Sequence, residues 1–319
     1  MFALHGGERR DYYRDMTQAA PSRMQDFLWR LEAVAFDVVI ACARILPVDA
    51  VSDLGAWFFK ALGPLTSAHQ VAEINLRIVF PQASDSEIAR LLRDQWDNTG
   101  RTFLELLIMD RIIGDRDRVE VVNGARLAQI AAKKEPVVFV SGHFANFEVM
   151  PAVIVNSPVV SQITYRAMNN PHVEARVRDY RFRYGVRYFA PKGGDGAREL
   201  LAALGRGESV ALMNDQKFNG GVAAPFFGRT VHTAPGPSRL ALRFDTVLQP
   251  MSVQRKRKAR FRVVVHEPIA LEKTGDMAAD IEAGVRKVNA FIEAQVLARP
   301  AEWFWTHRRW PNETYRRGR

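Results

Sequence analysis

The sequence predicts an α/β fold, in which a mostly parallel central sheet is flanked by helices and preceded by an N-terminal helical extension. From residue 119 onward, short apolar segments rich in β-branched residues alternate with segments of helical character, which is the order of βαβ units. Before that point, residues 24–113 show helical patterns only. A chain of 319 residues that is 47% hydrophobic can bury the core of such a domain.

These patterns divide the chain into four expected parts. Residues 1–23 are a tail, 24–113 a helical region, 114–312 the α/β core and 313–319 a basic tail. Breaks between the N-terminal helices are expected near Pro47, Gly63-Pro64 and Pro81. The core is expected to end with a strand pair around a basic turn and a helix at 276–297. The expected strands are 119–122, 137–141, 159–164, 186–189, 209–213, 246–254 and 260–266.

Charge and cysteine content limit the classes of partner and site. The 45 Lys and Arg against 35 Asp and Glu give a formal charge of +10, which favours partners that carry negative charge. Anionic lipid, an acidic carrier protein and nucleic acid all meet this condition, but no recognised nucleic-acid-binding module accompanies the charge. The single cysteine, Cys42, excludes an internal disulfide framework and a cysteine-based zinc site.

The N-terminal region predicts an amphipathic helix and no membrane span. No signal peptide is expected, because residues 1–20 mix charges and Tyr without an apolar segment. Four charged residues interrupt the stretch 27–47, so it lacks the ~18 continuous apolar residues of a span. Arg30, Asp37 and Arg44 recur every seven residues on one narrow stripe, and apolar residues lie opposite. Such a helix either lies in a membrane interface or packs on the domain.

The segment 137–148, Val-Val-Phe-Val-Ser-Gly-His-Phe-Ala-Asn-Phe-Glu, is the most informative for chemistry. Its apolar start is typical of a strand inside a parallel sheet, and Gly142 ends that strand. His143 therefore lies at the carboxyl end of a strand, where the active sites of such sheets gather. A His in this position can take the proton of an alcohol, and Glu148 can hold and polarise it. From chemistry alone, a pair of helix-capping residues is an equally good interpretation.

This segment resembles the H-x-x-x-x-(D/E) motif of the glycerolipid acyltransferase superfamily. Its second half, His-Phe-Ala-Asn-Phe-Glu, is similar to the form found in lipid A biosynthesis (lauroyl/myristoyl) acyltransferases. Five further blocks resemble that family in the same order, and the resemblance covers about residues 25–312. These blocks are Asn75-Leu-Arg-Ile-Val-Phe-Pro81, Thr164-Tyr-Arg-Ala-Met-Asn169, Asn214-Asp-Gln216, Pro225-Phe-Phe-Gly-Arg229 and Trp305-Thr-His-Arg-Arg-Trp310.

The resemblance implies a glycerol-3-phosphate acyltransferase-like fold and an O-acyltransferase activity. Enzymes of this kind move a fatty acyl chain from an acyl carrier protein thioester to a hydroxyl of a lipid A precursor. The resemblance implies His143 as the base, Glu148 as the residue that orients it, direct attack without an acyl-enzyme, and no metal or cofactor. It also implies peripheral or monotopic attachment to the cytoplasmic face of the inner membrane. An enzyme for another lipid acceptor, such as a phosphatidylinositol mannoside or ornithine lipid, and a non-catalytic lipid or carrier-protein binding protein are the alternatives.

Further site residues follow from the same resemblance. The implied substrate-binding residues are Arg166, Asn169, Asp215, Gln216 and Arg229. A guanidinium suits a phosphorylated acceptor, and a surface salt bridge is the less favoured interpretation of Arg166. Aromatic residues in the His143 motif and in the block 225–229 are candidates for an acyl channel, with simple packing as the alternative. These candidates are Phe144, Phe147, Phe226 and Phe227.

Two other segments are candidates for membrane contact. Six basic residues lie between positions 255 and 262, at the expected tip of the strand pair. A solvated turn is the default interpretation, and binding to an anionic membrane surface is the functional one. Segment 303–310 mixes three Trp with His and Arg, which is typical of a tail that faces a membrane interface or a headgroup.

Overall fold

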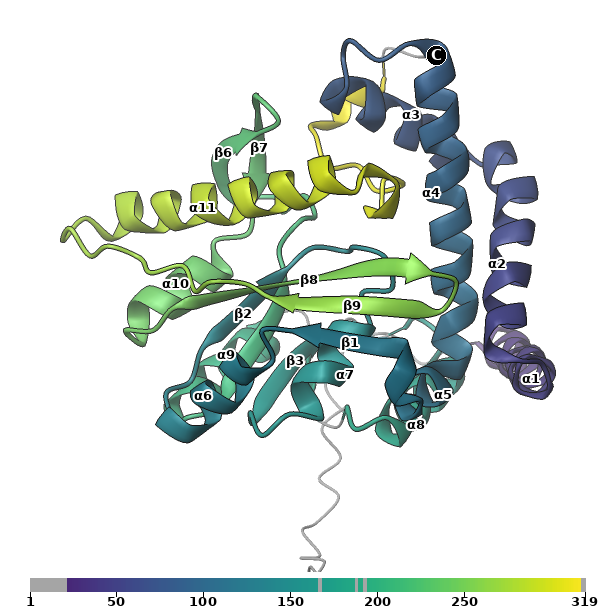
Figure 1. Cartoon of the computed structure of the whole chain (residues 1–319), viewed down its shortest axis with the longest axis horizontal. Helices are drawn as coiled ribbons and strands as arrows, with labels where there is room; N and C mark the ends of the chain where they lie inside the picture. The colour runs from purple at the N-terminus through teal and green to yellow at the C-terminus, as the bar shows by residue number, and fades with distance from the viewer. Residues whose placement is uncertain (1–21, 166–167, 187–188, 192–193, 317–319) are drawn as a thin grey trace, which may run out of the picture.

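A central seven-stranded sheet organises the chain, in the order β1-β9-β8-β2-β5-β3-β4 (Figure 1). The computed structural model describes residues 22–165, 168–186, 189–191 and 194–316. The strands of this sheet are β1 (Val119–Val122), β2 (Val138–Ser141), β3 (Ser161–Tyr165), β4 (Phe189–Pro191), β5 (Ser209–Met213), β8 (Leu248–Arg257) and β9 (Arg260–Val265). Strands β8, β2, β5, β3 and β4 are parallel, whereas β9 is antiparallel to β8 and parallel to β1. The predicted mostly parallel sheet and its terminal strand pair are confirmed.

The predicted strand at 186–189 lies too early in the chain, because the observed strand β4 spans Phe189–Pro191. Gly185 has φ +99° and closes the preceding helix in the left-handed conformation that favours glycine. The Val186 amide then donates to the carbonyl of Arg181, so Val186 belongs to the end of that helix. β-Branched character alone did not reveal this helix-terminating turn.

Helices cover both faces of the sheet. In Figure 1, α11 runs along one side together with α10, and α7 and α8 lie on the other side. The helices are α1 (Arg23–Ile45), α2 (Val48–Leu62), α3 (Ser67–Val79), α4 (Asp85–Glu105), α5 (Met109–Gly114), α6 (Ala125–Lys133), α7 (Val149–Val155), α8 (Pro171–Arg183), α9 (Gly194–Gly205), α10 (Gly236–Arg243) and α11 (Met277–Ala298). Short 3₁₀ turns occupy Gly63–Leu65, Leu106–Ile108, Arg116–Arg118, Pro300–Glu302 and Asn312–Tyr315.

The predicted helical region is formed by α1 to α5, with breaks near the three predicted positions. A capping box fixes the start of α4, because Ser84 and Glu87 each bond to the backbone of the other. α2 packs closely along α4 at Gly55 and Gly100. A Cβ atom on Gly55 would lie 2.3 Å from the Gly100 carbonyl oxygen, so only glycine permits this approach.

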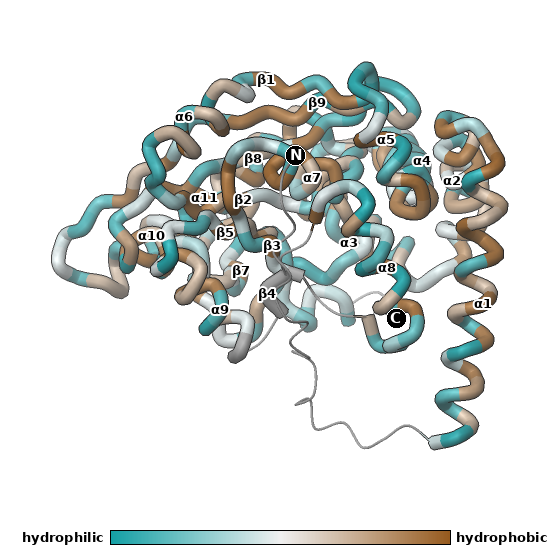
Figure 2. Tube along the Cα trace, turned by 90° about the horizontal axis from the view of Figure 1, so that it is seen from below, coloured by the Kyte–Doolittle hydropathy of each residue, from teal (hydrophilic) through white to brown (hydrophobic). Residues whose placement is uncertain are grey.

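α1 packs on the body through its charged stripe and leaves its apolar face exposed. Among the described residues, α1 forms the ion pairs Asp37–Arg176 at 2.7 Å and Arg44–Asp110 at 2.9 Å with α8 and α5. Asp26 also contacts His172 of α8 at 2.9 Å. On the opposite face, Leu28, Val38 and Ile45 are 50%, 56% and 83% exposed. Figure 2 shows α1 at the side of the molecule, with hydrophobic segments along its length. In the described part of the chain, no helix combines the length and apolar character that spanning a membrane requires.

A hairpin of β6 (Val222–Phe226) and β7 (Arg229–Thr233) lies outside the main sheet and was not predicted. Its turn places Phe227 at φ +49° and Gly228 at φ +71°. Two consecutive positive φ values give a turn that matches the twist of paired strands. A Phe in the first of these positions is unusual, so the local sequence gave no clear hairpin signal.

The C-terminal Trp-rich segment is buried, so the expectation of a membrane-facing tail is wrong. Trp303, Trp305 and Trp310 are each 0% exposed. Phe144 and Trp303 form an isolated antiparallel bridge, and the Phe304 amide donates to the His143 carbonyl. The segment therefore closes the core directly behind the loop that carries His143.

The basic cluster at the β8–β9 turn is also engaged within the protein. Arg255 is buried and ion-paired with Glu105, which removes it from any lipid-facing surface. Four of its neighbours pair with carboxylates at the surface. These pairs are Lys256–Glu120, Lys258–Asp53, Arg260–Asp49 and Arg262–Glu120. The cluster is thus largely neutralised by the chain's own acidic residues, which weakens its candidacy as a membrane-binding patch.

Candidate active site

His143 lies just beyond the end of β2, and the register of the sheet brings Asp215 beside it. In the parallel pair β2–β5, Ser141 is opposite Met213. Two residues further along, His143 and Asp215 leave neighbouring strand ends at the same sheet edge. The His143 Nδ1 lies 2.7 Å from Asp215 Oδ1, and the His143 backbone amide donates to Oδ2 at 2.8 Å. One carboxylate therefore fixes both the ring and the backbone of His143.

Asp215 is fully buried and yet remains ionised. Its Oδ2 also accepts a hydrogen bond from the indole N–H of Trp303 at 2.9 Å. Burial by itself raises the pKa of this carboxyl group. The charge and hydrogen bonds of His143, assisted by His307, outweigh burial and hold the pKa well below its ordinary value. At neutral pH the site therefore contains a carboxylate that can stabilise positive charge on His143.

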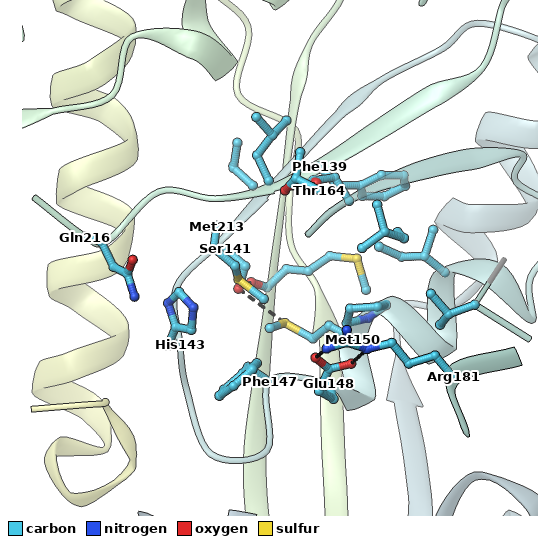
Figure 3. A pocket seen from close by; sticks show the side chains of 18 residues that line it. Phe139, Ser141, His143, Phe147, Glu148, Met150, Thr164, Arg181, Met213 and Gln216 are labelled. Atoms are coloured by element: carbon cyan, nitrogen blue, oxygen red, sulfur yellow. Dashed lines mark hydrogen bonds and ion pairs between the residues drawn. The ribbon is translucent and has the colours of Figure 1, made fainter. Parts of the chain in front are cut away.

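The hydrogen bond at Nδ1 makes Nε2 the basic atom of His143. Because Asp215 accepts at Nδ1, the neutral ring carries its proton there and keeps a free lone pair on Nε2. Figure 3 shows the imidazole at one end of a cavity. Phe147 packs against the ring edge-on, with centroids 4.9 Å apart. An alcohol that enters this cavity can meet the basic nitrogen, as a general base requires.

Glu148 lines the same cavity, where Figure 3 shows it beside Arg181, and it also contacts Tyr184. Arg181 forms an ion pair with both carboxylate oxygens, and the Tyr184 hydroxyl donates to Oε2 at 3.2 Å. Burial and the charge of Glu148 raise the pKa of Tyr184, so its hydroxyl stays a donor. The expectation that Glu148 orients His143 through direct contact is corrected, since Asp215 makes that contact.

The course of the β2–α7 loop explains this correction. Ala145 has φ +41°, so the chain turns sharply between the His and the Glu of the motif. Glu148 is the N-cap residue of α7 and faces α8 from there. Spacing in the sequence gave the positions of both side chains but not the direction of this turn.

Buried polar groups hold the loop from behind. The Asn146 amide donates to Glu105 at 3.0 Å, and Glu105 is itself ion-paired with Arg255. The Thr102 hydroxyl donates to the Ala145 carbonyl at 2.9 Å. These contacts fix the loop to α4 and β8, so the position of His143 depends on the packing of the helical region.

An apolar cavity of about 310 Å³ extends from His143 between the sheet and α7. Its walls come from β2, β3, β5, α7 and Met251 of β8. Besides His143, Glu148 and Arg181, the main lining residues are Phe139, Ser141, Phe147, Met150, Pro151, Ile154, Ile163, Val186, Leu212, Met213, Gln216 and Met251. Such a lining suits an aliphatic chain better than a polar ligand.

Of the four acyl-channel candidates, only Phe147 lines this cavity. Phe144 is buried in the bridge to Trp303. Phe226 is also buried and packs on the C-terminal Trp residues, and Phe227 packs on Phe226. The expectation that these three line an acyl channel is therefore wrong. Phe144 is held in the bridge to Trp303, and the β6–β7 hairpin directs Phe226 and Phe227 toward the core.

The substrate-binding candidates are dispersed. Gln216 lines the cavity, and Asp215 lies behind His143. Asn169 is exposed before α8, and Arg229 is exposed at the β6–β7 turn, so neither reaches the cavity. Arg166 lies outside the described residues. Within the described ranges, no three His, Cys, Asp or Glu side chains gather as ligands for a metal ion.

Sequence reasoning missed four residues that shape the site. Arg181 and Tyr184 form hydrogen bonds to the Glu148 carboxylate. Trp303 bonds to the carboxylate of Asp215, and His307 bonds to its backbone carbonyl. The high density of Trp near the C-terminus was the available signal for Trp303 and His307, because large aromatic residues are more often buried than exposed. Arg181 and Tyr184 carried no local signal, because their partner is reached only through the fold.

Comparison with known proteins identifies the family to which this site belongs. The model of the bacterial lipid A biosynthesis acyltransferase family matches residues 26–312. The chain belongs to this family. Relatives of this acyltransferase include the lipid A biosynthesis palmitoleoyltransferase of Escherichia coli (strain K12) and the lipid A biosynthesis acyltransferase of Shigella flexneri. Each is 25% identical over 274 residues, which cover 83% of this chain and 86% of the relative.

Membership establishes the protein as an O-acyltransferase of lipid A biosynthesis. A shorter stretch of 73 residues is 44% identical to a dihydroxy-acid dehydratase of Citrifermentans bemidjiense, but it covers 19% of this chain and 13% of that protein. A segment of this length does not describe the fold or the site. The family match, in contrast, spans the helical region, the sheet and the C-terminal segment together.

Proposed function

We propose that this acyltransferase moves a fatty acyl chain from an acyl carrier protein thioester to a hydroxyl of a lipid A precursor. The observation that carries the proposal is the His143–Asp215 pair at the mouth of an apolar cavity. Residues 114–312 are the catalytic core in this proposal, with a glycerol-3-phosphate acyltransferase-like fold. Residues 24–113 are the region that meets the membrane.

The proposed reaction is a direct attack in which His143 moves one proton. Nε2 takes the proton of the acceptor hydroxyl while its oxygen bonds to the thioester carbonyl carbon. Asp215 stabilises the imidazolium that forms. The tetrahedral intermediate then collapses, the carbon–sulfur bond breaks, and the leaving thiolate takes the proton from His143. No acyl-enzyme is needed, and Cys42 lies exposed on α1, outside the cavity.

The cavity supplies binding for the donor's acyl chain. The cavity extends from His143 to Phe139 on β2, Ile163 on β3 and Ile154 on α7. An acyl chain that enters beside His143 would therefore extend toward these three residues. Each methylene that leaves water there contributes about 0.8 kcal/mol. The thioester carbonyl would then stay near the basic nitrogen while the chain fills the cavity.

The proposed location is the cytoplasmic face of the inner membrane, with peripheral attachment through α1 and α2. The exposed apolar residues of α1 continue onto α2, where Trp57 is 66% exposed. Aromatic contacts connect this surface to the site through Phe59, Phe103 and Phe304, the last of which packs near His143. A lipid acceptor held in the membrane surface would therefore approach the cavity mouth from the side of α2.

The membrane proposal predicts a loss of vesicle binding. A Leu31→Glu/Val38→Glu variant places two charges on the exposed face of α1 and should bind anionic vesicles at least about tenfold more weakly, since two buried aliphatic groups are lost. Cosedimentation with vesicles measures this. A Met277→Glu/Leu297→Glu variant, which changes two equally exposed apolar residues of α11, is the matched control. Equal binding by both variants and wild type would refute attachment through α1.

The reaction is tested by product mass. Purified protein is incubated with acyl carrier protein thioesters of several chain lengths, the corresponding coenzyme A thioesters, and a tetra-acylated lipid A precursor. One added acyl mass is the expected result, with the carrier-protein donors preferred. A product formed only with a phosphatidylinositol mannoside or ornithine lipid would replace the acceptor, and no product from folded, vesicle-bound protein would favour a binding role.

A further inference from the structure

The catalytic cavity ends at one row of side chains that crosses three strands of the sheet. Phe139 on β2 and Ile163 on β3 each pair in register with Ala211 on β5, so these three side chains point to the same face. All three line the cavity, and within the described ranges no earlier residue of these strands does. The next row toward the catalytic end, formed by Ser141 and Met213, lies about 7 Å away. The row of Phe139 is therefore the far end of the cavity along the strands, and Figure 3 shows Phe139 away from the imidazole.

The wall at this far end is stiff, whereas the middle of the cavity can adapt. Ile154, about 9 Å along α7 from Glu148, joins Ile163 there, and β-branched side chains have few accessible rotamers. Phe139, Ile154 and Ile163 are 2%, 3% and 7% exposed, so the packed atoms behind them resist displacement. Flexible methionines line the middle of the cavity, namely Met150, Met213 and Met251. A ligand that reaches the far end therefore meets a surface that does not yield.

Ala211 leaves the centre of this row open. Its side chain ends at Cβ and stays partly exposed, whereas Phe139 and Ile163 on either side are buried. Because Ala211 lines the cavity, a longer side chain at this position would point into the space that a ligand occupies. The depth of the cavity between the two large neighbours therefore depends on the size of residue 211.

The volume of the cavity indicates the length of chain that fills it. An apolar cavity of about 150 Å³ binds benzene, which has six carbons. By the same ratio, the cavity of about 310 Å³ accommodates about twelve carbons. A chain of this length that starts beside His143 would fill the cavity up to the row of Phe139, Ala211 and Ile163.

We infer that the row of Phe139, Ala211 and Ile163 selects the length of the donor's acyl chain, with a preference for about twelve carbons. The inference rests on the proposed function, because it specifies the acyl donor of the same reaction. A longer chain would stop against this row and keep its thioester carbonyl away from His143. A shorter chain would leave apolar surface of the cavity uncovered, at a cost of about fourfold in binding for each missing methylene.

Ala211→Leu is the primary test. The larger side chain enters an existing cavity, so the variant should fold, and the chain that fits should be about three carbons shorter. The ratio of kcat/KM for dodecanoyl to that for octanoyl acyl carrier protein should therefore fall at least about tenfold. Mass spectrometry of the product measures this ratio, which is insensitive to a general loss of activity. Ala223→Leu makes the same change at an exposed position of β6, outside the cavity, and should keep the wild-type ratio.

Two variants at Ile163 test the same row in the opposite direction. Ile163→Ala should move the optimum to longer chains, and it provides the test if Ala211→Leu does not fold. Ala211→Leu combined with Ile163→Ala conserves the side-chain volume of the row and should bring the ratio back toward wild type. The same optimum in wild type and in folded single variants, or a wild-type optimum at hexadecanoyl, would overturn the inference.

A binding measurement separates failure of this inference from failure of the proposed function. Calorimetric titration with octanoate and dodecanoate, each below its micelle concentration, needs neither acceptor nor turnover. A preference for dodecanoate that is lost in Ala211→Leu and kept in Ala223→Leu supports the row even if the acceptor lipid differs from the proposed one. Equal preferences of all three proteins, with a wild type that transfers acyl groups, would reject the row and keep the reaction.

Discussion

Replacing His143 with Ala should lower kcat for acyl transfer about a thousandfold, because a positioned general base contributes 10²–10⁴ to the rate. Asp215→Asn should lower it about a hundredfold. The Asn side chain cannot hold Nδ1–H and stabilise the imidazolium as the carboxylate does. Single-turnover measurement of the mass-labelled product gives these rates without interference from product release.

Double variants test whether Asp215 or Glu148 acts on His143. In a His143→Ala background, Asp215→Asn should lower the remaining rate little further, because Asp215 acts through the His143 ring that it contacts. Glu148→Gln should lower the rate by the same factor in that background as in wild type, because Glu148 contacts Arg181 and Tyr184. The opposite pattern would restore the role first expected for Glu148.

The lowered pKa of Asp215 also has a consequence for stability. A carboxyl group whose pKa is lower in the folded than in the unfolded chain stabilises the fold above the unfolded pKa, about 3.9. That contribution is lost as the pH falls below 3.9 and through the folded value. The difference in unfolding free energy between wild type and Asp215→Asn should therefore be largest at neutral pH and shrink in acid. Urea titrations at several pH values measure it.

The largest expected effect on stability is at Arg255. Arg255→Met leaves Glu105, which is 0% exposed, without its cationic partner and should lower the free energy of unfolding by about 3–5 kcal/mol. The Asn146 contact that supports the catalytic loop depends on the same carboxylate. Activity should therefore fall at temperatures at which the variant is still largely folded. Urea denaturation and the temperature dependence of the rate measure the two effects.

Lys256→Met is the control for Arg255, because it breaks a pair exposed to solvent on the next residue of the same hairpin. Exposed pairs contribute at most about 1 kcal/mol, so this variant should stay close to wild type. A second variant, Arg255→Met with Glu105→Leu, removes both charges and should recover part of the lost stability. Equal stability of Arg255→Met and Lys256→Met would show that the buried pair does not hold the helical region to the sheet.

Local patterns in the sequence determined much of this protein. The alternation of apolar and helical segments predicted the strands β1, β2 and β5. The ordered motifs predicted the family. The seven-residue repeat gave the charged stripe and the apolar face of α1. These features could be predicted because periodicity and strand ends are encoded within about 20 neighbouring residues.

The tertiary structure decided which groups meet. Asp215 is 72 positions from His143, and they pair because β5 lies next to β2 in the sheet. The turn at Ala145 directs Glu148 to Arg181, and the same long-range packing buries the C-terminal Trp residues that local composition placed at a membrane. Sequence spacing fixes positions along an element, whereas strand order and loop direction depend on the packing of the whole chain.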